Sequence, residues 1–223
     1  MAIDRVILDL DNTLFHTSNF KVALLGALKP LGVTDEAFWG TYRHARDPHH
    51  GACQYRFKNH VDLIAQRQPL DQAAALNALG EVLARSEEFL FRDSKDFLSR
   101  IISLGISSIL LTRGDPEFQQ AKIAASGIDK LVERIIVTEE PKINRISECL
   151  EGARGAVYMV DDHLDATLEI VRRYPNIVPI LKRRPDLPPE RYLGSRILNF
   201  KTLEEIRDYL TIVQATNPHY AGE

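Results

Sequence analysis

The feature that most constrains the fold is a series of five short apolar runs, rich in Val and Ile, spread along the chain. They lie at residues 5–10, 107–112, 134–138, 156–161 and 176–181. Continuous apolar character over five or six residues is typical of strands that are covered on both faces, as in a parallel sheet. Helical patterns separate the later runs, at residues 115–126, 142–151 and 163–174. Because strands alternate with helices, the sequence predicts right-handed crossovers and an α/β fold, with one parallel sheet between two layers of helices.

Local signals mark where several of these elements begin and end. Asp115 followed by Pro116 predicts a helix start, since Asp caps the first turn and proline fits the first helical position. Gly127 predicts the end of that helix, because glycine readily adopts the left-handed conformation found after a last turn. A short strand is expected at residues 197–200, and a helix at residues 202–213 begins with the capping-box pattern TLEE.

The interval from residue 15 to residue 91 breaks the alternation of strands and helices. Apolar residues recur there at spacings of three and four, which predicts helices rather than strands. The four helical patterns lie at residues 19–30, 35–46, 55–66 and 70–89. We therefore expect an all-helical insert between the first strand and the rest of the core. The predicted division is a core of residues 1–14 and 92–213, a helical part of residues 15–91 and a flexible tail of residues 214–223.

Composition argues against several classes of protein. Apolar residues make up 44% of the 223, which is ample for a buried core. The 28 Lys and Arg residues nearly balance the 31 Asp and Glu residues, so the net charge of -3 offers no general attraction to nucleic acid or to an anionic membrane surface. No apolar stretch is long enough to span a membrane, the amino terminus lacks the features of a secretory signal, and a cytoplasmic location is expected. Cys53 and Cys149 are expected to be reduced thiols, and His49 and His50 lack further ligands at a spacing that suits zinc.

The strongest functional signal is the sequence DLDNT at residues 9–13, at the end of the first predicted strand. Asp9 and Asp11 share one face of that strand because side chains alternate, and ligands of open parallel sheets bind beyond the carboxyl ends of the strands. Two carboxylates there repel each other unless a cation or a proton intervenes, and Mg²⁺ is a hard ion that suits them. One Asp can then attack phosphorus while the other transfers a proton. The alternative is a carboxylate pair that only caps the next turn, and the motif alone does not decide between the two.

Three further elements follow later predicted strands. Thr112 and Arg113, followed by a glycine, close the second strand, where a hydroxyl and backbone N–H groups can hold a phosphate. Lys142 opens the helix after the third strand and can neutralise phosphoryl oxygens, although a solvated surface lysine is the commoner role. Asp161 and Asp162 end the fourth strand, where adjacent buried acids need a cation. We interpret Asp162 as the more direct Mg²⁺ ligand, with Asp161 beside it.

These elements, in this order, resemble the haloacid dehalogenase superfamily, and specifically its phosphatase branch. The similarity covers residues 3–173 and rests most heavily on the sequence VILDLDNTLF at residues 6–15. The resemblance implies a Rossmann-like core with an all-helical cap domain inserted after the first motif. It also implies a Mg²⁺-dependent phosphatase that releases phosphate from a small phosphorylated metabolite through an aspartyl-phosphate intermediate.

The resemblance further implies a role for each matching residue. Asp9 would be the nucleophile, and Asp11 would be the acid/base that also offers its backbone carbonyl to the metal. The phosphoryl group would be bound by Thr112, Arg113 and Lys142, although Arg113 stands where similar proteins frequently have Asn and could also point to solvent. The metal ligands would be Asp9, Asp11, Asp161 and Asp162.

Several alternatives stay open at this point. Asp165 matches a further acidic position of the family if the count begins at Asp161 but not if it begins at Asp162, so it either joins the metal site or only caps a helix. A phosphomutase would use the same aspartyl-phosphate, and a non-catalytic phosphate-binding regulatory module could keep the same fold. Carbon–halogen cleavage is disfavoured because it does not need the second acid, Asp11. The substrate and the oligomeric state are left open.

Overall fold

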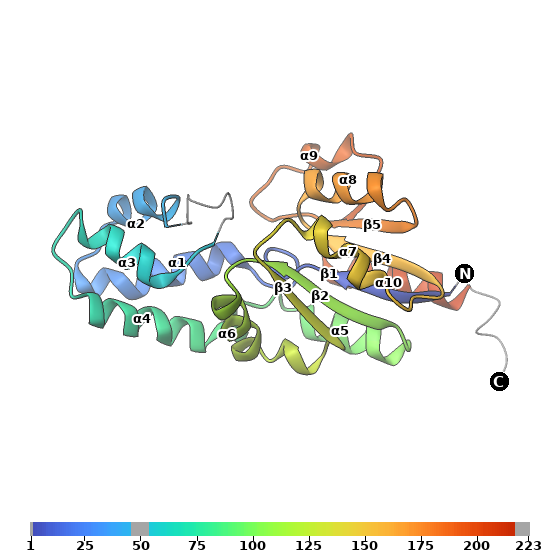
Figure 1. The fold of residues 1–223 in the computed structure, drawn as a ribbon, viewed down its shortest axis with the longest axis horizontal. Helices are drawn as coiled ribbons and strands as arrows, with labels where there is room; N and C mark the ends of the chain where they lie inside the picture. The colour runs from blue at the N-terminus through green and yellow to red at the C-terminus, as the bar shows by residue number, and fades with distance from the viewer. Residues whose placement is uncertain (1, 46–53, 217–223) are drawn as a thin grey trace.

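The fold is built on a six-stranded parallel sheet (Figure 1). The computed structural model describes residues 2–45 and 54–216. The strands are β1 Ile3–Leu8, β2 Ser107–Arg113, β3 Arg134–Thr138, β4 Ala156–Asp161, β5 Ile177–Lys182 and β6 Leu198–Phe200. Their order across the sheet is β3-β2-β1-β4-β5-β6, and every neighbouring pair is parallel. The predicted α/β fold with a Rossmann-like parallel sheet is therefore confirmed.

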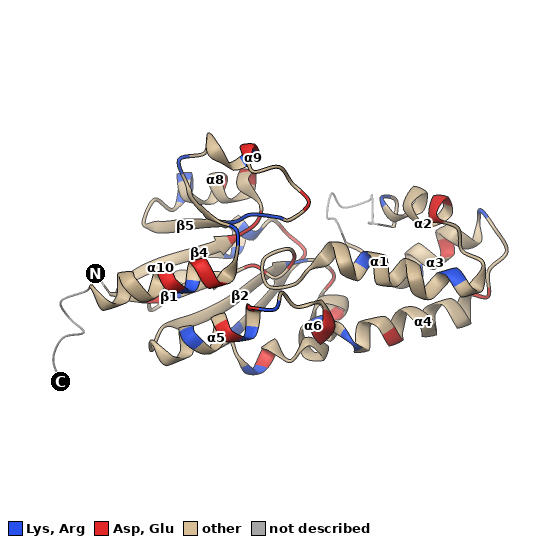
Figure 2. Ribbon diagram, turned by 180° about the vertical axis from the view of Figure 1, so that it is seen from behind, with Lys and Arg blue, Asp and Glu red and all other residues tan. Residues whose placement is uncertain are grey.

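Side chains that alternate along the strands divide the core into two layers. On β1, Val6 and Leu8 belong to one layer and Ile7 to the other, and all three are fully buried. The first layer is covered by α5 (Ser94–Ser103), α6 (Pro116–Ser126) and α10 (Leu203–Ala215). The second layer is covered by α7 (Ile146–Leu150) and α8 (Leu164–Arg173). Burial on both faces explains why the strands read as continuous apolar runs, and Figure 2 shows that charged residues occur along α5 and α10.

The residues predicted to start and end helices do so in the structure. The Asp115 side chain accepts a hydrogen bond from the backbone N–H of Phe118 at the start of α6, and Gly127 ends that helix with a φ of 72°. Thr202 and Glu205 form the predicted capping box of α10. No helix among the described residues is long and apolar enough to cross a membrane.

Some boundaries differ from the sequence prediction. The helix expected at residues 142–151 begins as the 3-10 helix η5 (Lys142–Arg145), because no side chain caps its first turn and Pro141 precedes it. The amphipathic helix α5 was not predicted at all. The last helix runs two residues further than expected, since Gln214 is buried and its side-chain oxygen accepts a hydrogen bond from the Ile3 N–H at 2.7 Å. The remaining short elements are α9 (Glu190–Leu193) and the 3-10 helices η1 (Lys29–Leu31), η3 (Ser86–Phe89) and η4 (Ile128–Lys130).

The insert between β1 and β2 forms a separate group of helices beyond one end of the sheet (Figure 1). It consists of α1 (Thr17–Leu28), α2 (Asp35–Tyr42), α3 (Phe57–Ala65) and α4 (Gln72–Ala84), and is called the helical unit below. Its buried side chains include Leu24, Phe38, Ile64 and Leu79. The predicted all-helical part is thus confirmed as a feature of the fold. Helix α2 ends at Tyr42, earlier than the prediction of 35–46, and Arg46, His49, His50 and Cys53 lie outside the described residues.

His60 is a buried polar group within the helical unit. Its Nε2 donates to the carbonyl oxygen of Phe38 at 3.1 Å, so Nδ1, 2.8 Å from the Tyr55 hydroxyl, is left as an acceptor for a neutral ring. Burial disfavours the charged ring and lowers the pKa of His60 from 6.5 to about 4.

This buried imidazole predicts acid sensitivity. Because the unfolded chain binds the proton more tightly, the free energy of unfolding should fall as the pH drops below 6.5, by about 3 kcal/mol at pH 4. Urea unfolding at pH 7.5 and 4.5 would measure this loss. In His60→Gln the starting stability is lower, but the pH dependence should be smaller by about 2 kcal/mol. Identical pH dependence in the two proteins would contradict the assignment.

Candidate active site

The residues singled out in the sequence meet at the carboxyl edge of the sheet, where the strand order reverses. β1 lies between β2 and β4, and the chain leaves toward β3 on one side and toward β6 on the other. A crevice outside the strands forms at such a switch point in open α/β sheets. It is a cavity of about 410 Å³. Its wall includes all seven predicted site residues, namely Asp9, Asp11, Thr112, Arg113, Lys142, Asp161 and Asp162.

The loop after β1 holds the Asp9 carboxylate in place. The N–H groups of Leu14 and Phe15 both donate to the carbonyl oxygen of Leu10, at 3.0 and 2.9 Å, which closes a tight turn. Asn12 adopts a φ of 61° in that turn, a left-handed conformation that Asn tolerates better than most residues. The buried Thr13 hydroxyl then donates to Asp9 Oδ2 at 3.2 Å. The DLDNT sequence is thus also the turn that aims the carboxylate.

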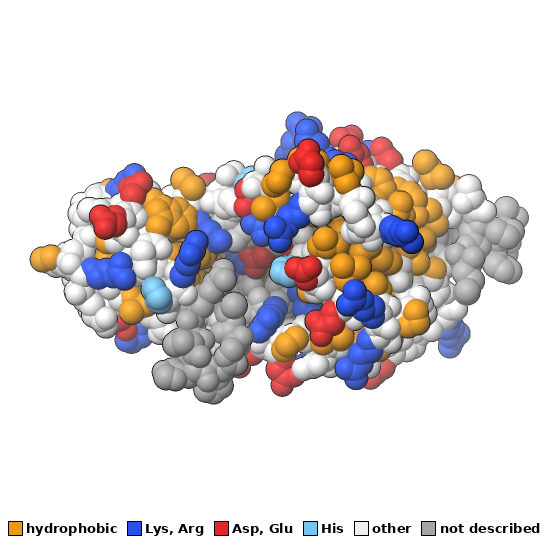
Figure 3. All heavy atoms as spheres, turned by 90° about the horizontal axis from the view of Figure 1, so that it is seen from above, with side chains coloured by type: hydrophobic (Ala, Val, Ile, Leu, Met, Phe, Trp, Pro, Cys, Tyr) orange, Lys and Arg blue, Asp and Glu red, His pale blue; other side chains and the backbone are white. Residues whose placement is uncertain are grey.

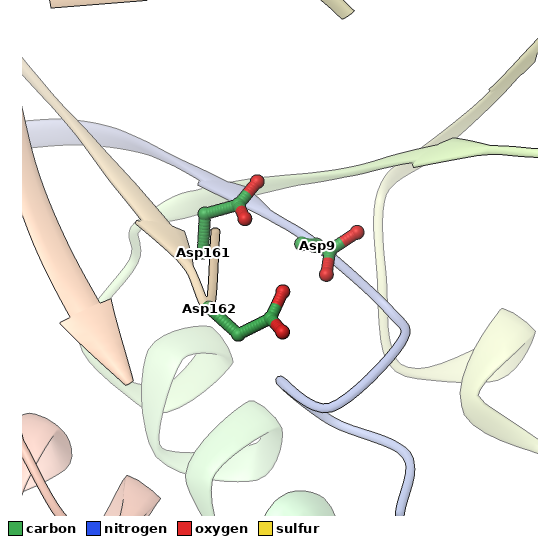
Figure 4. A group of neighbouring side chains, drawn as sticks. All are labelled: Asp9, Asp161 and Asp162. Atoms are coloured by element: carbon green, nitrogen blue, oxygen red, sulfur yellow. The ribbon is translucent and has the colours of Figure 1, made fainter. Parts of the chain in front are cut away.

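Three carboxylates converge at the bottom of the cavity, from Asp9 after β1 and from Asp161 and Asp162 at the end of β4 (Figure 4). One oxygen from each lies within 4.8 Å of the others, and all three residues are buried. Burial, together with the charges of Asp161 and Asp11, raises the pKa of Asp9 to about 6. Burial and the charges of Asp9 and Asp161 raise that of Asp162 to about 8. Such a cluster of hard oxygen donors fits a divalent cation.

Lys142 supplies positive charge to this cluster. Its ammonium group donates to Asp9 Oδ1 and to Asp161 Oδ2, each at 2.6 Å, and its side chain is only 12% exposed. Burial opposes the charged form, but Asp161 and Asp9 outweigh it and raise the pKa of Lys142. The surface role that is commoner for a lysine therefore does not apply here. Lys142 alone does not balance three ionised carboxylates, which agrees with the raised pKa of Asp9 and of Asp162.

Asp161 and Asp162 differ in what surrounds them. Asp161 is fully buried, and besides Lys142 it accepts a hydrogen bond from the His163 N–H at 2.8 Å. Asp162 faces the cavity, where its Oδ2 lies 3.3 Å from the Asn12 amide and 3.7 Å from the Arg184 guanidinium. The contacts of Asp162 are thus longer than those of Asp161, which leaves its carboxylate more accessible to a ligand in the cavity. Arg184 was not predicted, although its position just after β5 places it at the same sheet edge.

The Asp11 carboxylate lies outside the group of three. Its Oδ1 accepts from the Thr17 hydroxyl at 2.6 Å, its Oδ2 accepts from the Gln119 amide at 2.9 Å, and the Lys122 ammonium donates to both oxygens. Burial alone would raise the pKa of Asp11, but the charge and hydrogen bonds of Lys122, with those of Thr17 and Gln119, lower it to about 2. None of these three partners was predicted from the sequence.

The structure also locates the residues whose roles the sequence left open. Asp165 is exposed in the first turn of α8, apart from the carboxylate cluster, and the cap of that helix is His163 rather than Asp162 or Asp165. The Arg113 Nε donates to the carbonyl oxygen of Glu139 at 3.3 Å, while its side chain lines the cavity. Thr112 is buried, and its hydroxyl accepts from Gln119 at 3.2 Å.

Seen from above, acidic side chains lie deep in a hollow between the helical unit and the sheet, with basic side chains at its rim (Figure 3). The core and the helical unit meet there through α6. Arg56, at the start of α3, pairs with Asp115 at 2.7 Å, and Tyr55 packs edge-on against Phe118. The hollow is therefore bounded by both parts of the molecule.

Comparison with known proteins identifies one family for this chain. The sequence model for haloacid dehalogenase-like hydrolases matches residues 3–168. No curated protein matches the sequence. Among solved structures, a haloacid dehalogenase-like hydrolase from Burkholderia xenovorans is 17% identical over 93% of this chain and 96% of its own, with a TM-score of 0.74.

Two further structures show how broadly this fold is used. The L-2-haloacid dehalogenase RSc1362 is 15% identical over 95% of this chain and 100% of its own, with a TM-score of 0.64. A predicted phosphoglycolate phosphatase from Haemophilus somnus is 15% identical over 95% of this chain and 98% of its own, with a TM-score of 0.60. At these identities the likeness establishes the fold, and the chemistry has to be argued from the site.

Proposed function

Because this chain belongs to the haloacid dehalogenase-like hydrolase family, we propose that it is a Mg²⁺-dependent phosphohydrolase acting on a small phosphorylated metabolite. The observation that carries the proposal is the pairing of two differently held acids in one cavity. Asp9 is bound to Lys142 and adjoins the acidic pair of β4, whereas Asp11 is held apart by donors from α1 and α6. Two carboxylates in distinct surroundings suit a nucleophile and an acid/base.

The proposed reaction has two displacements. In the first, an Asp9 oxygen attacks phosphorus and the ester P–O bond breaks, while the Asp11 carboxylate, ionised near neutral pH, relays the proton of the bound phosphate monoester to the departing oxygen. In the second, water gives a proton to Asp11 and attacks the aspartyl-phosphate, and that proton leaves with the inorganic phosphate as the Asp9 carboxylate is restored. Lys142 would offset charge on the phosphoryl oxygens, and Thr112 with the backbone before α6 would help to hold them.

A divalent cation fits the acidic group beside this reaction centre. Asp9 and Asp162 would bind it directly, with Asp161 close by, and the Asp11 backbone carbonyl is a further proposed ligand. When bound, Mg²⁺ would neutralise the excess negative charge of the cluster and of the phosphate.

The leaving group decides between this proposal and dehalogenation. A halide departs without a proton, so a second acid would have no task in carbon–halogen cleavage. In this chain Asp11 is kept at the cavity by three donor side chains. That arrangement favours an oxygen leaving group. A phosphomutase remains the alternative on the same scaffold, and it would return the phosphate to the substrate instead of releasing it.

We propose further that residues 15–91 act as a cap. The two segments that join the helical unit to the core run side by side at the proposed boundaries. The His16 N–H donates to the Phe89 carbonyl at 2.7 Å, and the Phe91 N–H donates to the Leu14 carbonyl at 3.0 Å. A paired double connection of this kind supports movement of the helical unit as one body, which would exclude water and select the substrate.

Phosphate release from a panel of phosphorylated metabolites, with MgCl₂ and with a chelator, tests the proposal. We expect inorganic phosphate from a limited set of esters, and only with the metal. Halide release from 2-haloacids is measured in parallel. Halide without phosphate would overturn the proposal in favour of dehalogenation, and an isomerised product with retained phosphate would favour the mutase.

Metal binding can be predicted separately from activity. Titration calorimetry should show Mg²⁺ binding that weakens about tenfold from pH 7.5 to 6.5, because the raised pKa of Asp162 makes protons compete with the metal. Asp162→Asn should abolish this binding. The matched control is Asp165→Asn, since Asp165 is exposed and outside the cluster. Equal affinity in both variants would contradict the assignment of Asp162.

A further inference from the structure

One face of α6 is turned toward Asp11. Asp115, Gln119 and Lys122 recur at intervals of three and four residues, so they lie along the same side of the helix. The Lys122 side chain is only 3% exposed, and its ammonium lies 2.8 and 2.9 Å from the two oxygens of Asp11. The rings of Phe15 and Phe118 surround the same ammonium, at 4.9 and 5.7 Å from their centroids.

Asp11 is the only carboxylate within 4.0 Å of this ammonium among the described residues. A lysine is seldom buried unless it is paired, so the contact with Asp11 is what makes the position of Lys122 tolerable. The reverse also holds, since the ammonium touches both carboxylate oxygens and thereby fixes the rotation of the Asp11 side chain.

Gln119 adds a second restraint and links Asp11 to the neighbouring strand end. It is 4% exposed, and its amide nitrogen lies 2.9 Å from Asp11 Oδ2, 3.2 Å from the Thr112 hydroxyl and 3.2 Å from the Arg113 carbonyl oxygen. The acid proposed for proton transfer and the strand end proposed to hold phosphate are therefore bound to one side chain.

Asp11 also stands between two cavities. Besides the cavity that contains the three clustered carboxylates, it lines a neighbouring cavity of about 250 Å³ that none of those three lines. Gln119, Lys122 and Tyr55 are among the residues that surround this second space. The proposed reaction needs room for a leaving group beside Asp11, and this second space offers it.

We propose that Lys122 and Gln119 are positioning residues, which hold the Asp11 carboxylate between the phosphate and the leaving group so that the proton reaches the departing oxygen. This inference rests on the proposed phosphohydrolase activity. It assigns a function to a buried pair on α6 that the sequence motifs do not include. It also predicts which substrates depend on the pair, namely those whose leaving oxygen needs a proton.

The test compares two leaving groups. The first substrate is the alkyl phosphate hydrolysed best in the panel, and the second is 4-nitrophenyl phosphate, whose phenolate departs without a proton. Lys122→Met and Gln119→Leu should each lower kcat on the alkyl phosphate by about 100-fold, but by less than about 10-fold on the nitrophenyl ester, with little change in KM. Lys122→Arg, which keeps the charge, should recover part of the loss.

Two controls make the outcome specific. Lys130→Met, in the short helix after α6, should leave both rates unchanged. Asp11→Asn should show the same contrast between substrates as Lys122→Met, and a larger one. If Lys122→Met does not fold, as judged by circular dichroism, Gln119→Leu and Lys122→Arg carry the comparison.

Equal losses on both substrates, or no loss on either, in the folded variants would overturn the positioning role. If Asp11→Asn shows the contrast and the α6 variants do not, the inference fails while the proposed function stands. If Asp11→Asn shows no contrast, the acid role of Asp11 in the proposed function fails and the inference falls with it. Wild-type protein that releases no phosphate from either ester would refute both.

Discussion

Asp9→Asn is expected to lower the rate of phosphate release by about four orders of magnitude or more, because an amide cannot form the phosphoester on which the proposed reaction depends. The change is nearly isosteric, because the amide oxygen can keep the hydrogen bond from Lys142 while the amide NH2 donates to the Thr13 hydroxyl instead of accepting from it. The measurement is phosphate release at saturating substrate with MgCl₂.

The stability of the same variant should not fall along with its activity. Burial and the nearby acids raise the pKa of Asp9, so its charged form is held at a cost in the folded protein near neutral pH. Removing that charge should leave the free energy of unfolding unchanged or higher. Asp4→Asn, on the same strand but far from its carboxyl end, should keep full activity. Substantial activity in Asp9→Asn would show that another group is the nucleophile.

The strands and the position of the acids could be predicted because each depends on a few neighbouring residues. A strand buried on both faces must be apolar throughout, and residues that follow parallel strands gather at one edge. The caps at Asp115 and Thr202 are likewise local, since the side chain bonds a backbone group three residues ahead. Helix α5 was missed although its buried Phe97, Leu98 and Ile101 recur at helical spacing, a pattern that the sequence analysis did not assign to any element.

The partners of Asp11 could not be predicted in this way. Lys122 is 111 residues from Asp11 in the sequence, and a single lysine in a helix is most often on the surface. Only the packing of α6 against the loop after β1 shows that it is buried. Arg184 is similar, since it follows a predicted strand, but an arginine at that point has no fixed role until the acids beside it are located. Motifs thus identify groups near the reaction, whereas the groups that hold them depend on tertiary contacts.

Lys142→Met should produce two separate defects. The rate of phosphate release should fall by about 1,000-fold, because the variant lacks the cation that would offset charge on the phosphoryl oxygens. The free energy of unfolding should also fall, by about 3 kcal/mol at pH 8, since Asp9 and Asp161 lose the buried ammonium that lies 2.6 Å from each.

The second defect should be reversible while the first is not. Without Lys142, the pKa of Asp9 rises further above its unfolded value, so the folded state binds more protons than the unfolded one and regains stability as the pH falls from 8 toward 6. MgCl₂ should restore stability at pH 8 by the same logic, through added positive charge. Urea unfolding with and without MgCl₂, alongside phosphate release, separates the two, with Lys130→Met as the surface control. If Lys142→Met is as stable as the wild type at pH 8 without metal, Lys142 does not balance the charge of the acidic cluster. If Mg²⁺ restores the activity of this variant, the reaction depends on the positive charge of Lys142 and not on its position.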